Sequence, residues 1–161
     1  MTRAIVLSDS HGDDSGLRWL LEQCWRYVGP VDAYFHCGDG ARDFQRLERF
    51  IRARDEHALL LGVKGNCDYF DDLPETRVAA LGGARLLLTH GHRFQVKRTN
   101  AALDMEAAQN GCQGALFGHT HLPLVEQRRT LLINPGSAAN GHLAVLTETE
   151  GRLTAEIMDF A

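Results

Sequence analysis

Aspartate, asparagine and histidine side chains recur just after short apolar runs of this sequence. Their oxygen and imidazole nitrogen atoms suit hard to borderline divalent metal ions, and the set contains no thiolate. Seven ligands are too many for one tetrahedral ion, and they suit two ions roughly 3.5–4 Å apart. The sequence therefore predicts a dinuclear metal site and not a structural zinc site. The candidate ligands are Asp9, His11, Asp39, Asn66, His90, His119 and His121.

Two of these histidines belong to the stretch 116–121, which reads Leu-Phe-Gly-His-Thr-His. The apolar residues predict the end of a buried strand, and Gly118 marks the point where a loop begins. Two histidines that are two residues apart in an extended segment point to opposite sides. We therefore expect His119 and His121 to serve different ions, with Thr120 as a spacer. Solvated loop histidines are the alternative interpretation.

Short apolar runs alternate with amphipathic stretches before residue 70. We expect strands over 4–7, 33–35 and 59–63, and two helices between them. Asp14 or Ser15 is expected to cap the first helix, which ends at Gly29-Pro30. One helix with the apolar positions Phe44 to Ile51 is expected after the second strand. Three strand–helix repeats predict a parallel, doubly covered sheet, whose ligands bind at the carboxyl ends of its strands.

The second half of the chain is richer in strands. Strands over 76–81 and 85–89 are joined by Gly82-Gly83, which indicates a hairpin. A helix capped by Thr99 or Asn100 is expected to run to Asn110, where a glycine follows. Further strands are predicted over 124–127, 131–133, 143–147 and 153–158. We expect one α/β domain over residues 1–161, with two sheets packed face to face and helices outside.

The composition is that of a soluble globular protein. The 161 residues are 44% hydrophobic and 24% charged, and the net charge of −4 argues against nucleic-acid binding. No apolar stretch has the length of a membrane span, and residues 1–3 lead directly into a strand without a signal peptide. Four scattered cysteines without a Cys-x-x-Cys pair indicate neither a disulfide framework nor a zinc knuckle. A cytoplasmic location is expected.

Five short motifs in a fixed order carry a family resemblance. The sequence resembles the calcineurin-like metallophosphoesterases, and its size and Gly-Asn-Cys-Asp form are similar to the small phosphodiesterases of the YfcE type. The resemblance extends from residue 5 to Ser137, because Asn-Pro-Gly-Ser at 134–137 also matches. The motifs are Asp9-x-His11, Gly38-Asp39, Gly65-Asn66-x-Asp68, Thr89-His90-Gly91-His92 and Gly118-His119-Thr120-His121.

This resemblance implies a four-layer α/β/β/α sandwich with two mixed sheets. It also implies a hydrolase, a metal-dependent phosphodiesterase in which a metal-bridging hydroxide attacks a small phosphodiester. Manganese is the expected ion, with iron, zinc or nickel as alternatives. In the ligand set that the resemblance implies, Asp39 bridges both ions. The first ion is then held by Asp9, His11 and His121, and the second by Asn66, His90 and His119.

Cys67 departs from the wider family, in which many members have a histidine that protonates the leaving group. A cysteine of ordinary pKa is a poor proton donor to an alkoxide. Water or His92 remains as the proton donor. The catalytic candidates are Asn66 and His92. For Cys67, packing beneath the metals is the alternative role. Asp68 is expected to orient its loop or to accept a hydrogen bond from a ligand imidazole. At 138–141 a proline–arginine pair of related sequences is absent.

Two other functions remain in play. A binding scaffold on the same fold, as in the retromer subunit that resembles these enzymes, would tolerate the loss of ligands. Every expected ligand type is present here, which favours the enzyme. Phosphomonoesterase activity is disfavoured by Cys67. Apolar strand edges in the second half could pair subunits into a homo-oligomer.

Overall fold

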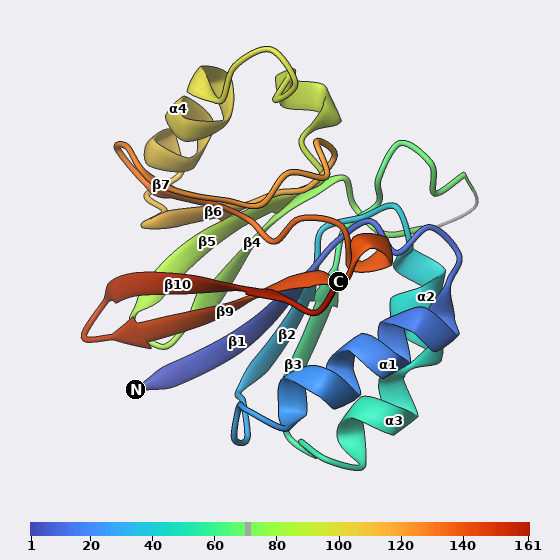
Figure 1. Ribbon diagram of the computed structural model, residues 1–161. Helices are drawn as coiled ribbons and strands as arrows, with labels where there is room; N and C mark the ends of the chain where they lie inside the picture. The colour runs from blue at the N-terminus through green and yellow to red at the C-terminus, as the bar shows by residue number, and fades with distance from the viewer. Residues whose placement is uncertain (70–71) are drawn as a thin grey trace.

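Two five-stranded sheets lie face to face at the centre of the molecule, and helices cover their outer faces (Figure 1). The computed structural model describes residues 1–69 and 72–161. Helices α1, α2 and α3 lie on one outer side, and α4 lies on the other. This arrangement confirms the predicted four-layer α/β/β/α sandwich. Within the described ranges, no helix has the length and apolar character needed to cross a membrane.

The first sheet has the strand order β10-β9-β1-β2-β3. Strands β1, β2 and β3 run parallel to one another. Strand β9 is antiparallel to both of its neighbours, β1 and β10, so the sheet is mixed. The predicted parallel sheet is therefore correct for three strands of the five. The strand bounds are β1 (Thr2–Leu7), β2 (Ala33–His36), β3 (Leu59–Gly62), β9 (His142–Thr149) and β10 (Arg152–Asp159).

Helix α1 (Asp14–Trp25) covers the outer face of this sheet with leucines at helical spacing. Leu17, Leu20 and Leu21 are buried in one cluster with strand residues of β1 and β2. The cap is Asp13, whose carboxylate accepts the Gly16 N–H at 2.8 Å. The expectation of Asp14 or Ser15 was wrong because the N-cap carboxylate reaches an amide three residues ahead.

The single helix expected around residues 44–51 is divided into two. Helices α2 (Ala41–Arg46) and α3 (Glu48–Arg52) meet at Leu47, where φ is −91° and ψ is 3°. Leu47 is itself buried in the cluster beneath α1. The apolar spacing spans the junction, so the sequence pattern alone did not reveal the break.

The second sheet has the order β4-β5-β6-β8-β7. The β4–β5 hairpin forms as predicted, with Gly82 at φ +55° in its turn. Helix α4 (Ala101–Gln109) packs Leu103 and Ala107 against this sheet. Thr99 Oγ1 accepts the first helical N–H, and within the described residues the Asn100 side chain makes no capping bond. The strand bounds are β4 (Thr76–Leu81), β5 (Ala84–Thr89), β6 (Gly114–Leu116), β7 (Leu124–Gln127) and β8 (Leu131–Asn134).

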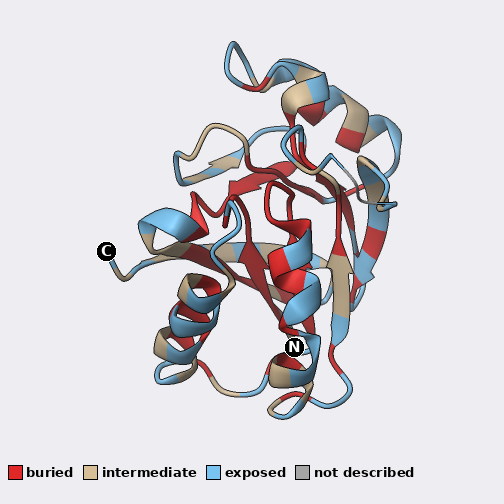
Figure 2. Ribbon diagram, turned by 90° about the vertical axis from the view of Figure 1, so that its right-hand side faces the viewer, coloured by how far each residue is buried: buried red, intermediate tan, exposed pale blue. Residues whose placement is uncertain are grey.

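The inner faces of the two sheets form a shared apolar core. Val6 and Phe35 from the first sheet pack with Leu88 and Ile133 from the second, and burial follows the strands (Figure 2). The central strands β1, β2, β6 and β8 lie between the other sheet and the outer helices, so they are buried on both faces and read as continuous apolar runs. The edge strands β3, β4, β7 and β10 are partly exposed. Short 3₁₀ turns, η1 (His92–Phe94) and η2 (Ala138–Asn140), follow β5 and β8.

Candidate metal centre

Five of the predicted ligands have left-handed backbone conformations. The φ angles are +55° at Asp9, +50° at His11, +55° at Asp39, +70° at His119 and +63° at His121. Such values are uncommon for residues other than glycine and carry a backbone cost. Each chain segment thus turns sharply as it leaves its strand. The expectation that His119 and His121 lie in an extended segment was wrong.

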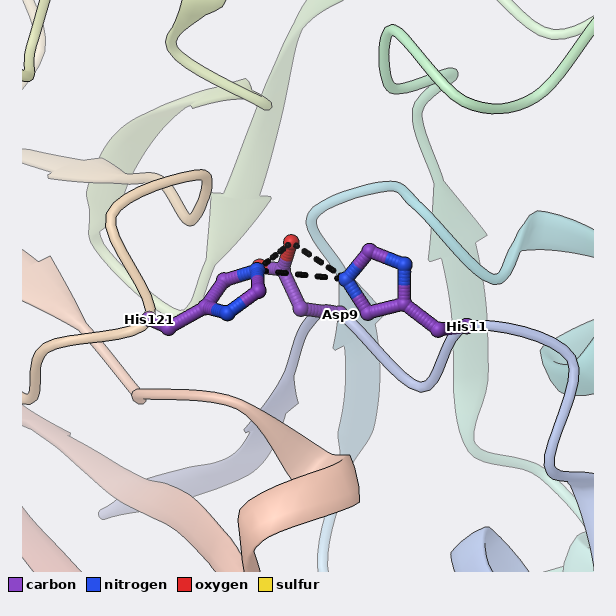
Figure 3. Close-up of side chains that lie close together, drawn as sticks. All are labelled: Asp9, His11 and His121. Atoms are coloured by element: carbon purple, nitrogen blue, oxygen red, sulfur yellow. Dashed lines mark hydrogen bonds and ion pairs between the residues drawn. The ribbon is translucent and has the colours of Figure 1, made fainter.

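The two histidines nevertheless face different partners. His121 Nε2 lies 3.1 Å from His11 Nε2 and 3.1 Å from Asp9 Oδ1 (Figure 3). His11 Nε2 lies 3.4 Å from the same carboxylate oxygen. Atoms that share one ion about 2.1 Å away lie roughly 3–3.5 Å from one another. Asp9, His11 and His121 therefore have the spacing of three ligands of one metal ion.

Asp9 Oδ1 is the chemical focus of this group. The side chain is fully buried, and this oxygen has no hydrogen-bond partner among the described residues. The other oxygen, Oδ2, accepts bonds from Ser8 Oγ at 2.5 Å and from the His119 backbone N–H at 3.1 Å. An unpaired buried carboxylate oxygen is costly unless a cation lies against it. The site thus fits a divalent ion.

A second group surrounds His90. Its Nε2 lies 3.2 Å from Asp39 Oδ2 and 3.2 Å from His119 Nδ1. His90 Nδ1 is 2.8 Å from the Cys37 carbonyl oxygen, to which it donates. In neutral His90 this bond fixes the tautomer and leaves the Nε2 lone pair facing the group, as bonds from backbone carbonyls do for metal-binding histidines.

Asp39 lies between the two groups. The Asp39 carboxylate belongs to two groups of potential metal ligands whose atoms lie within 4.8 Å of one another. One group contains Asp9 and His90, and the other contains His11 and Cys67. Asp39 Oδ1 also accepts the Cys67 backbone N–H at 2.8 Å, which holds the carboxylate in place. This position suits a carboxylate shared by two ions.

Asp39 and His119 have the ionisation states of metal ligands at neutral pH. Burial alone would raise the pKa of Asp39, but its contacts with His90 and the Cys67 N–H hold that pKa well below its ordinary value. Burial and the neighbouring His90 lower the pKa of His119 to about 4. Asp39 is therefore a carboxylate and His119 a neutral imidazole, the forms that bind metal. Burial alone would lower the pKa of His90, but its contact with Asp39 and the charge of Asp9 raise that pKa, so an ion that binds here displaces the His90 proton.

Asp68 holds the loops in which these ligands lie. Its two carboxylate oxygens accept the backbone N–H groups of Asp39, Gly40, Ala41 and Gly65 at 2.7 to 3.2 Å. Asp68 thus joins its own loop to the loop that follows β2, as expected of a residue that orients a loop. A bond from Asp68 to a ligand imidazole is not seen within the described part of the chain.

Cys67 is exposed, so the alternative in which it packs beneath the metals is wrong. Partial desolvation of its sulfur and the charge of Asp39 raise the pKa of the thiol, which stays protonated at neutral pH. The exposed Asn66 donates through Nδ2 to Cys67 Sγ at 3.7 Å. A ligand role for Asn66 stays a prediction.

His92 lies beside the second group. Its ring centroid is 5.5 Å from that of His90 and 6.1 Å from that of His119. Its Nε2 is 3.9 Å from Glu75 Oε1, while its buried Nδ1 has no partner among the described residues. Burial and the nearby His90 lower the pKa of His92. Its catalytic role stays a prediction.

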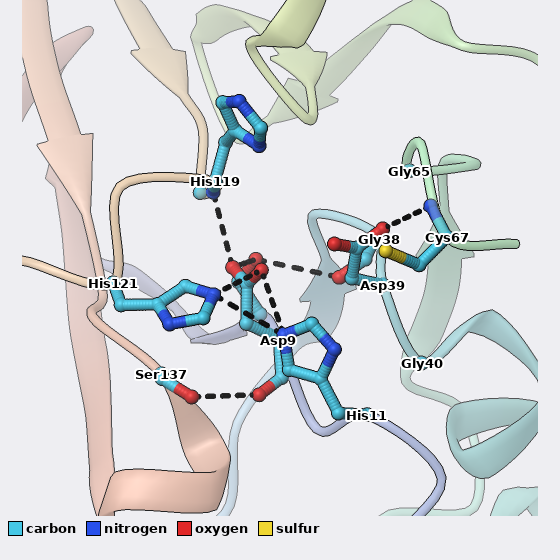
Figure 4. Close-up of polar contacts among 12 residues, drawn as sticks. Asp9, His11, Gly38, Asp39, Gly40, Gly65, Cys67, His119, His121 and Ser137 are labelled. Carbon is cyan, nitrogen blue, oxygen red and sulfur yellow. Dashed lines mark hydrogen bonds and ion pairs between the residues drawn. The ribbon is translucent and has the colours of Figure 1, made fainter. Parts of the chain in front are cut away.

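Several hydroxyl and amide side chains that the sequence did not single out hold the ligand segments. Ser137 Oγ donates to the Asp9 carbonyl at 2.7 Å (Figure 4). Asn134 Nδ2 donates to Thr120 Oγ1 at 2.9 Å, so Thr120 is more than a spacer. The Asn-Pro-Gly-Ser motif at 134–137 was the sequence signal for two of these residues.

Gly118 is required by close packing beside the carboxylate of Asp9. A Cβ atom at this position would lie 2.0 Å from Ser8 Oγ and 2.5 Å from Asp9 Oδ2. Its backbone carbonyl accepts a bond from Asn134 Nδ2 at 3.0 Å. The glycine of the Gly-His-Thr-His motif thus allows the loop after β6 to approach the end of β1.

The chain matches a family model and several named relatives. The model described as calcineurin-like phosphoesterase superfamily domain matches residues 2–152. A probable metallophosphoesterase of Bacillus subtilis, YsnB, is 34% identical over 83% of this chain and 73% of its own length. The phosphodiesterase YfcE of Escherichia coli K12 is 34% identical over 86% of this chain and 80% of its own length.

Solved structures show the same fold. A predicted phosphoesterase from Streptococcus pneumoniae superposes with a TM-score of 0.77 at 30% identity, covering 98% of this chain and 89% of the other. Vps29 of Entamoeba histolytica, complexed with Zn²⁺, has a TM-score of 0.71 at 20% identity, covering 99% and 100%. The Vps29 likeness shows the fold alone. The family model and the two relatives confirm the expected resemblance, and the chain belongs to the calcineurin-like phosphoesterase superfamily.

Proposed function

We propose that this protein is a dinuclear metal-dependent phosphodiesterase that hydrolyses a small phosphodiester. In this proposal Asp39 serves both ions, and manganese is the expected metal. Asp9, His11 and His121 would hold one ion, and Asn66, His90 and His119 the other. Membership of a phosphoesterase superfamily and the relative named phosphodiesterase YfcE support the reaction class.

The observation that carries the proposal is the environment of Asp9 Oδ1. This oxygen is buried and has no hydrogen-bond partner in the described part of the chain, and the Nε2 atoms of His121, His11 and His90 lie 3.1, 3.4 and 3.9 Å from it. A buried carboxylate oxygen without a hydrogen bond destabilises the fold unless a cation compensates its charge. The energetic cost favours a site built for cations.

Divalent ions bound here supply positive charge for the phosphate oxygens and lower the pKa of a water molecule that acts as nucleophile. The protein's own part is to hold the ligands before substrate arrives. Asp68 and the Cys67 N–H position Asp39, and the Cys37 carbonyl orients His90. Such preorganisation lowers the barrier because little reorganisation is needed during the reaction.

The groups around the leaving oxygen favour substrates with stable leaving groups. Cys67 is a protonated thiol of raised pKa, and the lowered pKa of His92 makes that imidazole neutral at pH 7. Neither is a strong general acid under these conditions. The leaving oxygen would then receive its proton from water, as the sequence suggested as one alternative.

The test is hydrolysis of bis-p-nitrophenyl phosphate and of p-nitrophenyl phosphate by the purified protein with Mn²⁺, with and without chelator. We expect turnover of the diester that is faster than that of the monoester and is abolished by chelator. A preference for the monoester would indicate a phosphomonoesterase. Absent or chelator-insensitive turnover with Mn²⁺, Fe²⁺, Zn²⁺ and Ni²⁺ would indicate a binding scaffold and contradict the proposal.

A further inference from the structure

A cavity of about 380 Å³ opens beside the candidate metal centre, on the side of α2. We name it the α2 cavity. Its lining includes His11, Asp39, Arg42, Arg46 and Cys67. Two predicted metal ligands and two arginines thus border one continuous space. Its volume lies within the range of small-molecule sites in proteins.

The two arginines reach this cavity from the exposed face of a short helix. Arg42 and Arg46 are four residues apart in α2, which places them on the same side of the helix. Among the described residues, no carboxylate lies within ion-pair distance of Arg42. Arg46 Nη1 is 4.0 Å from Asp14 Oδ2, and both side chains are largely exposed, which makes this a weak pair.

Asp43 and Asp68 also line the cavity, and their carboxylates accept hydrogen bonds from backbone amides. Asp43 Oδ2 accepts the Gly12 N–H at 2.8 Å, and the oxygens of Asp68 accept four other N–H groups. Asp39 faces His90 and the Cys67 N–H. The guanidinium groups of Arg42 and Arg46 therefore remain available for an anion that enters the cavity.

We propose that the α2 cavity binds a second anionic group of the substrate, carried on one ester arm beyond the phosphate that is hydrolysed. This inference rests on the proposed phosphodiesterase function and specifies its substrate class as phosphodiesters with a terminal phosphomonoester on one arm. Guanidinium groups bind phosphate through paired N–H donors, which fits such a group. The shared lining by His11 and Asp39 places the arm next to the reacting phosphate.

Two matched probes test this specificity. A thymidine dinucleotide and its 5′-phosphorylated form differ only by a terminal phosphate, and both contain the same phosphodiester. With Mn²⁺, we expect kcat/KM of the wild type to be about tenfold higher for the phosphorylated form, since charged hydrogen bonds are worth this much. In the double variant Arg42→Gln with Arg46→Gln, this ratio should fall to near one.

Two controls make the result specific. Arg42→Lys retains the charge without the paired donors, so its kcat/KM ratio for the two dinucleotides should lie between those of the double variant and the wild type. Arg49→Gln removes an exposed arginine of α3 that does not line the cavity, so the ratio should stay at the wild-type value. A wild-type ratio near one, or a ratio that the double variant retains, would overturn the proposal.

A binding measurement separates this inference from the proposed reaction. Thymidine 3′,5′-bisphosphate and thymidine 3′-phosphate are titrated calorimetrically into the Mn²⁺-loaded protein, with phosphate release assayed in the same samples. Tighter binding of the bisphosphate that depends on Arg42 and Arg46 would support the cavity even if no diester were hydrolysed. Diester hydrolysis with equal binding of both nucleotides would contradict the cavity and leave the proposed function standing.

Discussion

The Nε2 atoms of His11 and His121 lie 3.1 Å apart, although 110 positions separate the two histidines in the sequence. They meet because the end of β1 and the loop after β6 converge on one rim of the sandwich. Asp9 Oδ1 lies within 3.4 Å of both nitrogens. Placing two imidazoles and a buried carboxylate at these distances is costly unless a cation lies among them.

Divalent ions are expected to stabilise the folded protein. At an ion concentration of about 100 times Kd, binding contributes about 2.7 kcal/mol, which corresponds to a rise in Tm of roughly 5–10 °C for a chain of this size. The rise is measured by differential scanning fluorimetry with Mn²⁺ against chelator. It should be much smaller in His11→Ala and His121→Ala.

His57→Ala is the matched control for this experiment. His57 is an exposed histidine, with a side chain 92% accessible, and it precedes β3, whereas the candidate ligand Asn66 follows the other end of that strand. This variant should show the full wild-type rise in Tm. An equal rise in His11→Ala, His121→Ala and wild type would contradict the assignment of these ligands.

Replacement of Asp39, the carboxylate proposed to serve both ions, should strongly lower turnover. Asp39→Ala removes the group placed between both ligand sets, and we expect kcat/KM for bis-p-nitrophenyl phosphate to fall by about 100-fold or more. Metal content, measured by mass spectrometry of the purified variant, should fall in parallel. Glu22→Ala, which removes an exposed carboxylate of α1, serves as the control and should retain wild-type turnover. Near-wild-type activity of folded, metal-supplemented Asp39→Ala would refute the dinuclear assignment.

A histidine at position 67 should supply the proton donor that Cys67 does not provide. Cys67→His is expected to increase turnover of diesters with poor alkoxide leaving groups by about tenfold or more, which is a modest share of general acid catalysis. The rate for bis-p-nitrophenyl phosphate should change less, because nitrophenolate leaves without protonation. Cys67→Ser tests for a role of the thiol itself. A large loss of turnover in Cys67→Ser would show that the sulfur takes part in the site.

His36 is expected to make stability depend on pH. Burial lowers its pKa to about 4, while its Nδ1 accepts the Gly38 N–H and its Nε2 contacts Ser10 Oγ. The unfolded state therefore binds a proton at higher pH than the folded state, and stability falls as pH decreases from 6.5 toward 4. Between pH 7 and pH 5 the loss is about 2 kcal/mol.

The measurement compares denaturant unfolding of wild type and His36→Asn in chelator at pH 7 and pH 5. Asparagine retains an acceptor for the Gly38 N–H but does not titrate, so the variant should lose less stability over this interval. All other titrating groups are common to both proteins and cancel in the comparison. Parallel pH profiles for the two proteins would show that His36 does not contribute.

Much of the fold could be predicted because its central strands are buried on both faces and read as apolar runs. The apolar runs at 4–7, 33–35 and 59–63 match β1, β2 and β3 to within a few residues. The division of α2 from α3 was missed because the apolar spacing continues through Leu47. The cap of α1 was misplaced by one residue, since Asp13, Asp14 and Ser15 are all capping residue types.

The sequence by itself determined which residue types follow each strand, and thereby the candidate ligands and the family. The left-handed backbone of Asp9, His11, Asp39, His119 and His121 was decided by the tertiary structure, because only packing between segments maintains a conformation that local preference opposes. The same is true of the unpartnered Asp9 oxygen and of the space that Arg42 and Arg46 border. These features depend on distances between segments far apart in the chain, which residue order does not specify.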